Sequence, residues 1–180
     1  MANPPDYGGS NWGDTMDARS LLAKVPFFAE VLSPADLDAL ALAASRTDYD
    51  RDAVLMREGD PGDSLLVIAS GNVSVTVGGR TQTVATLGPG DVVGEMSLLT
   101  GAKRSASVVA LRPVVAYRIG KEQLRPILDH SPSLYERFAA MVEKRKAELG
   151  DIYGPGIEKL YFASRAHLVN AMRTFFGKAD

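Results

Sequence analysis

Hydrophobic and polar positions alternate in the central part of the chain and recur at helical spacing on both sides of it. Between residues 73 and 77, three valines are separated by Ser and Thr, the two-residue period of a half-buried strand. Short apolar runs occur at 54–56 and 65–68, and a Gly-Gly pair at 78–79 predicts a hairpin. Several short strands with frequent turns predict a sandwich or barrel over residues 47–119.

Helical patterns precede this central part. Ser33-Pro34-Ala35-Asp36 is typical of a helix start, with an N-cap serine, a proline at the first helical position and an acid in the first turn. An earlier helical pattern begins near Met16 and ends before Pro26. We therefore expect helices over 16–46. Residues 1–15 are rich in Gly, Pro, Asn and Asp and predict a flexible leader.

The helical pattern returns after Gly120 and is expected to form two helices over 121–149. Pro126 should kink or shorten the first of them. Ser131-Pro132 predicts the start of the second, longer one. Residues 150–180 form a separate helical extension with too many apolar residues to leave in water on a lone helix, so we expect them to pack on the domain or on a second copy. These residues are Ile157, Leu160, Tyr161, Leu168, Met172 and Phe175.

Composition bounds the class of protein. The chain has 180 residues, 46% hydrophobic and 23% charged, as a globular domain with extensions would have. A net charge of −2 does not favour binding to nucleic acid or to an anionic membrane surface. There is no cysteine for a disulfide or a thiolate zinc site. No apolar run reaches the roughly 18 to 20 residues that span a bilayer.

One stretch, residues 93–108, is suited to a small anion. Gly94 opens a run compatible with a short helix and Gly101 ends it. The first turn of a helix leaves backbone N–H groups unpaired and favours negative charge. Because Gly94 has no Cβ, a ligand can approach the backbone. Arg104 offers a planar, permanently charged fork to a phosphate, and Glu95 can accept hydrogen bonds from a sugar hydroxyl.

This stretch resembles the phosphate-binding cassette of cyclic-nucleotide-binding domains. In that family the cassette runs Phe-Gly-Glu, an aliphatic residue, Ala or Ser, Leu, a short variable run, and then Pro-Arg followed by small and hydroxyl residues. Val93 stands where Phe is usual and Lys103 where Pro is usual, and neither change removes a ligand contact. The resemblance covers about residues 20–149. The matching residues are Gly94, Glu95, Met96, Ser97, Leu98, Arg104, Ser105, Ala106 and Ser107.

The resemblance implies an α+β fold, with an antiparallel jelly-roll β-barrel flanked by N- and C-terminal helices. The domain would occupy residues 16–149, between the leader and the extension. It implies a non-catalytic sensor that binds cAMP, and also cGMP, without a metal or cofactor, and that moves its C-terminal helix. The residues implied to bind the ligand are Gly94, Glu95, Met96, Ser97, Arg104, Ser105, Ala106 and Arg145.

For three of these residues the sequence also allows a role that involves no ligand. Arg104 could form a surface ion pair. Ser105 could simply be small, or its hydroxyl could reach the phosphate or a purine amino group, and the family associates a hydroxyl here with tolerance of cGMP. Arg145 lies on the helix that closes over the base in this family, but with Lys144 and Lys146 beside it the residue could equally be a solvated helical charge.

Catalysis and DNA binding find little support in the sequence. His130 and His167 have no convincing partners in sequence, and no nucleophile or Walker-type motif occurs, so no enzyme activity is expected. Residues 151–180 offer one helical pattern and no second recognition helix, which argues against a DNA-binding module.

The remaining outputs are a cytoplasmic regulatory domain of a cyclic-nucleotide-gated or mechanosensitive-type channel, whose pore domain is absent from this chain, or a free-standing sensor, either of which could form a homo-oligomer. The alternative class is a degenerate domain that binds no nucleotide and acts as a protein-interaction scaffold. The retained Gly94, Glu95 and Arg104 argue against that alternative.

Overall fold

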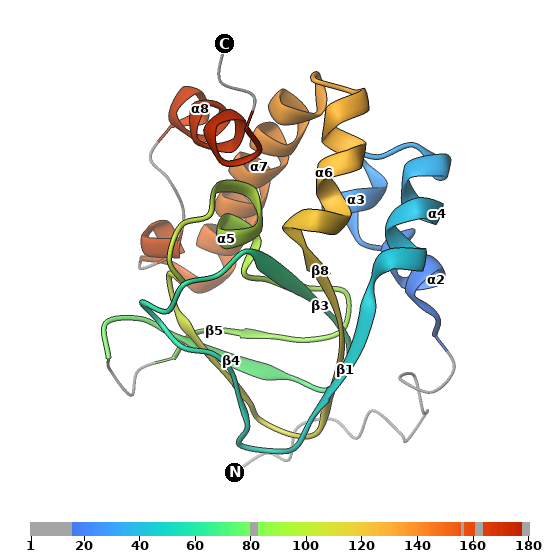
Figure 1. The fold of residues 1–180 in the computed structure, drawn as a ribbon. Coiled ribbons are helices and arrows are strands. Elements are labelled where there is room, and N and C mark those ends of the chain that lie inside the picture. Colours follow the sequence, from blue (N-terminus) through green and yellow to red (C-terminus); the bar gives the residue numbers. More distant parts are fainter. Residues whose placement is uncertain (1–15, 80–82, 156, 161–163, 178–180) are drawn as a thin grey trace.

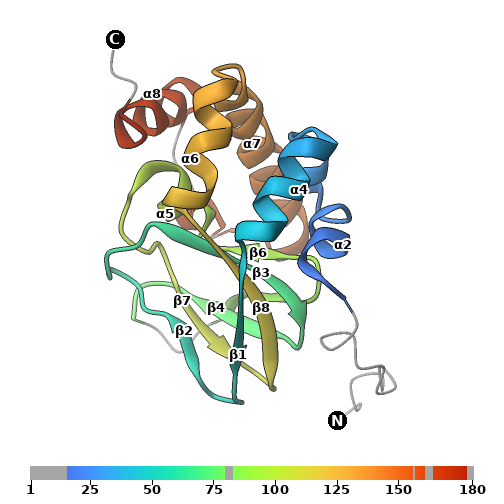
Figure 2. The same ribbon diagram turned by 45° about the vertical axis from the view of Figure 1, so that its right-hand side comes forward.

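The computed structural model describes residues 16–79, 83–155, 157–160 and 164–177, so the predicted leader at 1–15 and Tyr161 lie outside the described residues. Figures 1 and 2 show a β-roll below a group of helices. The elements are α2 (Ala18–Leu22), α3 (Pro26–Ala29), α4 (Pro34–Ala43), β1 (Ser45–Tyr49), β2 (Val54–Met56), β3 (Ser64–Ser70), β4 (Val73–Thr76), β5 (Thr83–Leu87), β6 (Val92–Val93), α5 (Glu95–Thr100), β7 (Ser107–Ala110), β8 (Val114–Gly120), α6 (Lys121–His130), α7 (Leu134–Tyr153), the 3-10 helix η1 (Ile157–Leu160) and α8 (Arg165–Phe175).

Two antiparallel four-stranded sheets form the roll. Their strand orders are β1-β8-β3-β6 and β2-β7-β4-β5. The hairpin predicted at 78–79 joins β4 to β5, with Val73 opposite Leu87. Inward and outward positions alternate in burial along β4, as the sequence pattern indicated. The predicted α+β class, with an antiparallel roll and flanking helices, is confirmed.

Strand β3 explains why the run at 65–68 is continuously apolar. Leu65 and Val67 belong to the core between the first sheet and the helices, whereas Leu66 and Ile68 belong to the core inside the roll. Both faces of the strand are therefore covered, and alternation with polar residues is lost. The helices pack on this first sheet, which leaves the second sheet to line the interior of the roll (Figure 2).

The N-terminal helix starts follow the predicted capping chemistry. Ser33 Oγ accepts a hydrogen bond from the Asp36 N–H at 3.1 Å. Asp17 caps α2 by accepting from the Ser20 N–H at 2.7 Å, which holds the pKa of the Asp17 carboxyl below its usual value. The roll begins at Ser45, two residues before the predicted 47, because Ser45 pairs with Arg118 of β8.

The predicted end of α7 is wrong, and α6 is not shortened at its proline. Helix α7 does not end at 149 but runs through Gly150 to Tyr153, where Gly154 ends it with φ +73°. Glycine costs only about 1 kcal/mol inside a helix, and the contacts of this last turn with the roll offset that cost. Helix α6, ten residues long, includes Pro126, so the proline does not shorten it, because burial of Leu124, Ile127 and Leu128 outweighs the hydrogen bond that proline removes.

The C-terminal extension packs back onto the domain. Leu168, Val169, Met172 and Phe176 are buried in the core that the helices share with the first sheet, and Ile157 is buried in the core of the roll. Among the residues described, no helix combines the length and the apolar character needed to cross a bilayer.

Candidate functional site

The site residues expected from the sequence all line one cleft, between the second sheet, α5 and the far half of α7. The cleft has a volume of about 510 Å³, including its open mouth. Its apolar floor comes from Met56, Val75, Ala85, Leu87 and Val108. The lining also includes the eight residues named from the sequence, which are Gly94, Glu95, Met96, Ser97, Arg104, Ser105, Ala106 and Arg145. The lining combines apolar side chains with charged groups, which suits a ligand that has both an apolar part and an anionic part.

Two left-handed glycines bound α5, the short helix at the back of the cleft. Gly94 has φ +83° and Gly101 has φ +70°, a backbone conformation that L side chains rarely adopt. A Cβ on Gly94 would stand 2.6 Å from Nη1 of Arg104 and 2.7 Å from Cε of Met56. The missing side chain therefore lets Arg104 and Met56 close onto the backbone at this point.

Arg104 is held in place by Ser64, the first residue of β3, and by the loop between β2 and β3. Its Nη1 donates to the Ser64 carbonyl at 2.5 Å and its Nη2 donates to Ser64 Oγ at 3.0 Å. The backbone of Arg104 also bonds to this loop, because its N–H donates to the Asp60 carbonyl and its carbonyl accepts from the Gly59 N–H. A Cβ on Gly62 would collide with the guanidinium. The sequence did not indicate Ser64, because no local motif links it to an arginine forty positions away.

The Arg104 guanidinium is partly shielded from water. Burial lowers the pKa of the Arg104 guanidinium, and the nearby Asp63 carboxylate works in the opposite direction. An arginine stays protonated under either influence. The guanidinium is therefore a fixed cation with part of its hydration removed, which favours capture of an anion from solution.

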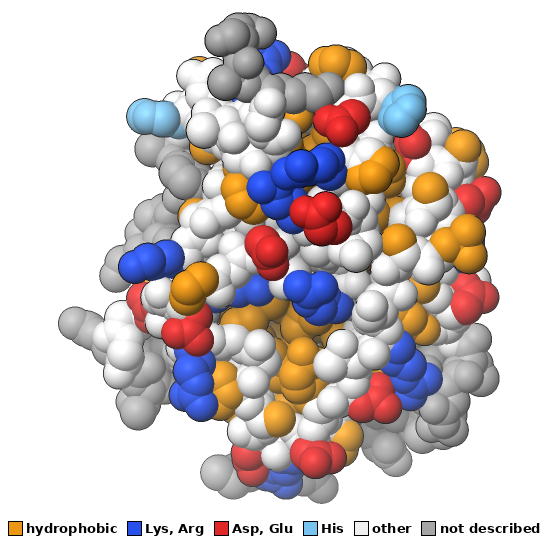
Figure 3. Space-filling model, in the orientation of Figure 1, with side chains coloured by type: hydrophobic (Ala, Val, Ile, Leu, Met, Phe, Trp, Pro, Cys, Tyr) orange, Lys and Arg blue, Asp and Glu red, His pale blue; other side chains and the backbone are white. Residues whose placement is uncertain are grey.

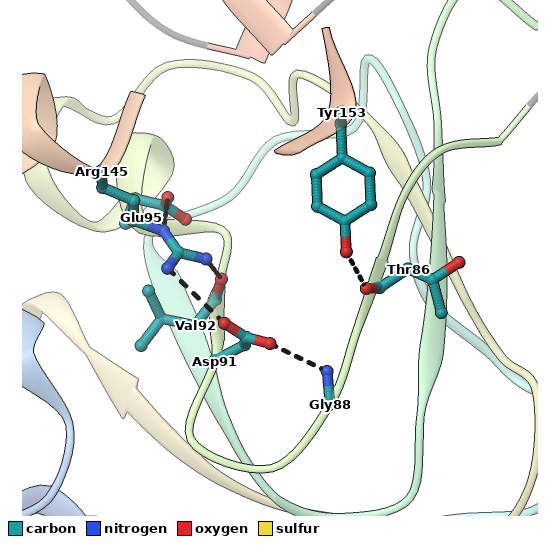
Figure 4. A network of polar contacts seen from close by, with 7 residues as sticks. All are labelled: Thr86, Gly88, Asp91, Val92, Glu95, Arg145 and Tyr153. Carbon is teal, nitrogen blue, oxygen red and sulfur yellow. Dashed lines mark hydrogen bonds and ion pairs between the residues drawn. The ribbon is translucent and has the colours of Figure 1, made fainter. Parts of the chain in front are cut away.

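Arg145 lies inside the cleft and not in solvent. Its Nε donates to Glu95 Oε1 at 3.0 Å and its Nη2 donates to the Val92 carbonyl at 2.7 Å (Figure 4). A longer ion pair of 3.8 Å joins Nη1 to Asp91, whose other oxygen accepts from the Gly88 N–H. The side chains of Arg145 and Glu95 are only 14% and 7% exposed. Arg145 is therefore not a solvated helical charge, and its contact with the base of a ligand stays a prediction.

The last turn of α7 and the segment after it cover the cleft. Tyr153 donates from its hydroxyl to the Thr86 carbonyl on β5, and Figure 4 shows the ring reaching across to that strand. Leu149 and Ile157 are buried against the roll, and Leu160 packs beside them. Sequence periodicity could not have indicated Tyr153, because the helix was expected to end before it.

The remaining predicted residues contribute in different ways. Met96 is 5% exposed and its side chain belongs to the core shared with the helices, so its backbone is what faces the cleft. Ser97 Oγ donates to the Ala102 carbonyl at 2.8 Å and closes the turn after α5. Ser105 and Ala106 follow Arg104 on the cleft wall.

The charges around the site are mixed. In the view of Figure 3, basic and acidic side chains are interspersed, and hydrophobic side chains line a hollow in the middle of this face. Within the described ranges, no cluster of three or more His, Cys, Asp or Glu residues is placed to hold a metal ion. The candidate cations for an anionic ligand in the cleft are Arg104 and Arg145.

Comparison with known proteins agrees with this geometry. The family model "Cyclic nucleotide-binding domain" matches residues 46–131. The chain is 32% identical over 120 residues to the cyclic AMP receptor protein of Thermus thermophilus, covering 65% of this chain and 56% of that protein. It is 33% identical over 134 residues to a cyclic nucleotide-gated potassium channel of Mesorhizobium japonicum, covering 74% of this chain and 36% of the channel.

A solved structure of a cyclic nucleotide-binding-like protein from Brucella abortus superposes with a TM-score of 0.56 and 30% identity, covering 63% of this chain and 99% of that one. The chain belongs to the cyclic-nucleotide-binding domain family. It spans little more than half of the Thermus receptor and about a third of the Mesorhizobium channel.

Proposed function

We propose that this chain is a non-catalytic sensor that binds cAMP, and also cGMP, in the cleft between α5, the second sheet and α7. The observation that carries the proposal is the convergence of Arg104, Glu95 and Arg145 on one cleft. Arg104 comes from the loop before β7, Glu95 from α5 and Arg145 from α7, so three separate elements meet around the space that the ligand would fill.

Each end of a cyclic nucleotide has a partner in this arrangement. Arg104 would bind the cyclic phosphate, with the backbone around Gly94 close beside it. Glu95 would accept from the ribose hydroxyl. A carboxylate has several acceptor positions, so Glu95 can bind that hydroxyl and Arg145 together. The apolar floor, which includes Val75 and Leu87, would cover the base.

The output we propose is the position of α7. This helix crosses the mouth through Arg145, Leu149 and Tyr153, so a ligand in the cleft contacts it directly or through Glu95. A ligand that binds the covered arrangement more tightly than an uncovered one shifts the population toward the former. The named relatives include both a receptor protein and a potassium channel, and α7 could serve either kind of output.

The competing function is a scaffold that has lost nucleotide binding. Arg104 and its hydrogen bonds to Ser64 weigh against a scaffold. Partial burial of a charged guanidinium beside the cleft lowers the stability of the domain unless a bound anion compensates for it. The same folded domain would serve a scaffold without Arg104.

Isothermal titration calorimetry with cAMP, cGMP and 5′-AMP tests the proposal. The parent should bind both cyclic nucleotides with a Kd of about micromolar or lower, and the open phosphomonoester 5′-AMP more weakly. Arg104→Ala should lose roughly 2–4 kcal/mol of binding free energy, because the phosphate loses its charged partner. Arg112→Ala, which removes an exposed arginine on the turn before β8, is the matched control and should bind like the parent. Absence of heat with both cyclic nucleotides would favour the scaffold.

A further inference from the structure

Helix α8 touches both of the elements that shape the cleft. It packs against α5 at the back of the cleft and against α7, which crosses its mouth. Figure 1 shows α8 above α5 and beside α7, at the end of the domain opposite the turns of the roll. A helix far from the ligand space is therefore joined to it through two separate contacts.

The contact with α5 is centred on Phe175 and Gly101. The Phe175 ring lies so close to Gly101, the residue that ends α5, that a Cβ at Gly101 would collide with it. Nζ of Lys121 lies 4.0 Å from the centre of the same ring, a cation–π contact. Phe176 packs edge-on to Phe175 at 5.2 Å and is 3% exposed.

The contact with α7 includes an ion pair and buried apolar side chains. Arg165, the first residue of α8, donates from Nε and Nη2 to one oxygen of Glu143 at 2.8 and 2.5 Å. Glu143 is two residues before Arg145. Leu168 and Met172 are buried in the core that α7 shares with the first sheet. Movement of α7 at Arg145 would therefore change the surface on which α8 sits.

Helix α5 depends on such contacts because it has only six residues. A helix this short is not stable by itself, since nucleation costs more than its few hydrogen bonds return. Its first residue, Glu95, faces the cleft, and its last turn carries the Gly101 contact with Phe175. The roll supports one end of α5 and α8 supports the other.

We propose that docking of α8 holds α5 and α7 in the nucleotide-binding arrangement, so that α8 docking and nucleotide binding strengthen each other. The proposal rests on the proposed function, because it takes the cleft to be a cyclic-nucleotide site. Coupling between two binding events is reciprocal: if docked α8 raises the affinity for the nucleotide, the nucleotide must tighten the docking of α8 by the same factor. A partner that lifts α8 from Gly101 would then release the nucleotide.

Phe175→Ala tests the coupling, with Asn170→Ala, an exposed position on the same helix, as the matched control. Calorimetry should show cAMP binding weakened by about five-fold or more in Phe175→Ala, the lower end of ordinary allosteric coupling, and unchanged in the control. Phe175→Leu keeps apolar volume on Gly101 and should fall between the two. It carries the test if the alanine variant does not fold. Affinities of Phe175→Ala or Phe175→Leu equal to that of the parent would overturn the proposal.

Amide hydrogen exchange separates this proposal from the function on which it rests. Without nucleotide, Leu98, Leu99 and Gly101 should exchange faster in Phe175→Ala than in the parent, because α5 has lost its support. With cAMP, the amides of α8 should exchange more slowly in the parent. If the parent binds neither cyclic nucleotide, the proposed function fails. Unchanged exchange in α5 would overturn the role of α8 whatever the nucleotide result.

Discussion

Nε of Arg145 lies 3.0 Å from Oε1 of Glu95 and joins the helix after the roll to the first residue of α5, fifty positions earlier. Both side chains are largely shielded from water, at 14% and 7% exposed. Shielding strengthens the attraction between the charges and also raises the cost of leaving either charge without the other. The ion pair therefore fixes α7 against α5, and it also fixes the position of both side chains in the cleft.

The losses from removing the two partners of this pair should not add. We expect Arg145→Ala to lower the free energy of unfolding by roughly 1–3 kcal/mol, because Glu95 loses its ion-pair partner at a site shielded from water. Glu95→Gln combined with Arg145→Ala should lose less than the sum of the single changes. Urea unfolding of the four proteins in the cycle gives the coupling energy directly.

The neighbouring residue on α7 supplies the control for that cycle. Lys144 pairs with Glu30 at 3.0 Å, but its side chain is 50% exposed and that of Glu30 is 48% exposed. Lys144→Ala should therefore change the free energy of unfolding much less than Arg145→Ala does. If Lys144→Ala and Arg145→Ala lost the same free energy of unfolding, the shielded Arg145–Glu95 pair would not hold α7 more firmly than the exposed pair.

Gly62→Ala should weaken cAMP binding although Gly62 does not line the cleft. A Cβ there would collide with the Arg104 guanidinium and push it away from Ser64. We expect a loss of about 1–2 kcal/mol in binding free energy, similar to losing one charged hydrogen bond. Gly150→Ala is the matched control. The space around that helical glycine is open, so the variant should bind normally and be slightly more stable. Unimpaired binding by Gly62→Ala would mean that Arg104 tolerates displacement.

Ser105→Ala should separate the two nucleotides. Ser105 lies next to Arg104 on the cleft wall. Only guanine carries an exocyclic amino donor that reaches this hydroxyl when the base is syn. The variant should lose about 1 kcal/mol of cGMP binding beyond its loss of cAMP binding, the value of one neutral hydrogen bond. Competition titrations of both ligands measure this difference. Equal losses would show that Ser105 contacts only the phosphate.

Tyr135→Phe should stabilise the domain. Tyr135 is 1% exposed, and its hydroxyl has no hydrogen-bond partner among the described residues. An unsatisfied buried hydroxyl is costly, so its removal should raise the free energy of unfolding by roughly 1 kcal/mol. Thermal unfolding at neutral pH measures this gain. A loss of stability would instead point to a partner for the hydroxyl, such as a buried water.

The same variant has a pH signature. Burial raises the pKa of the Tyr135 phenol in the folded protein. A raised folded pKa means that this group's contribution to stability is complete below the unfolded value, about 10, and is lost as the pH rises toward the folded value. The parent should therefore lose stability above about pH 10 more steeply than Tyr135→Phe. Identical alkaline unfolding curves would remove Tyr135 as the cause.

Much of the fold and part of the candidate site follow from local patterns in the sequence. The alternation at 73–77, the turn at 78–79 and the Ser33 cap act over a few residues, so their physics can be read without knowing the fold. The same holds for α5, because Gly94 and Gly101 set its two ends. The cassette from Gly94 to Ala106 is contiguous, which is why its members could be named together.

Tertiary structure alone decided the features that join distant segments. Whether Arg145 faces solvent or Glu95 depends on where α7 crosses the roll, and the end of α7 depends on the contact of Tyr153 with β5. Ser64 became part of the site because the β2–β3 loop folds onto Arg104. The contact between Phe175 and Gly101 joins two segments that are far apart in the sequence and share no pattern in it. Such contacts arise from packing between elements, and packing is not encoded in the spacing of residues along any one of them.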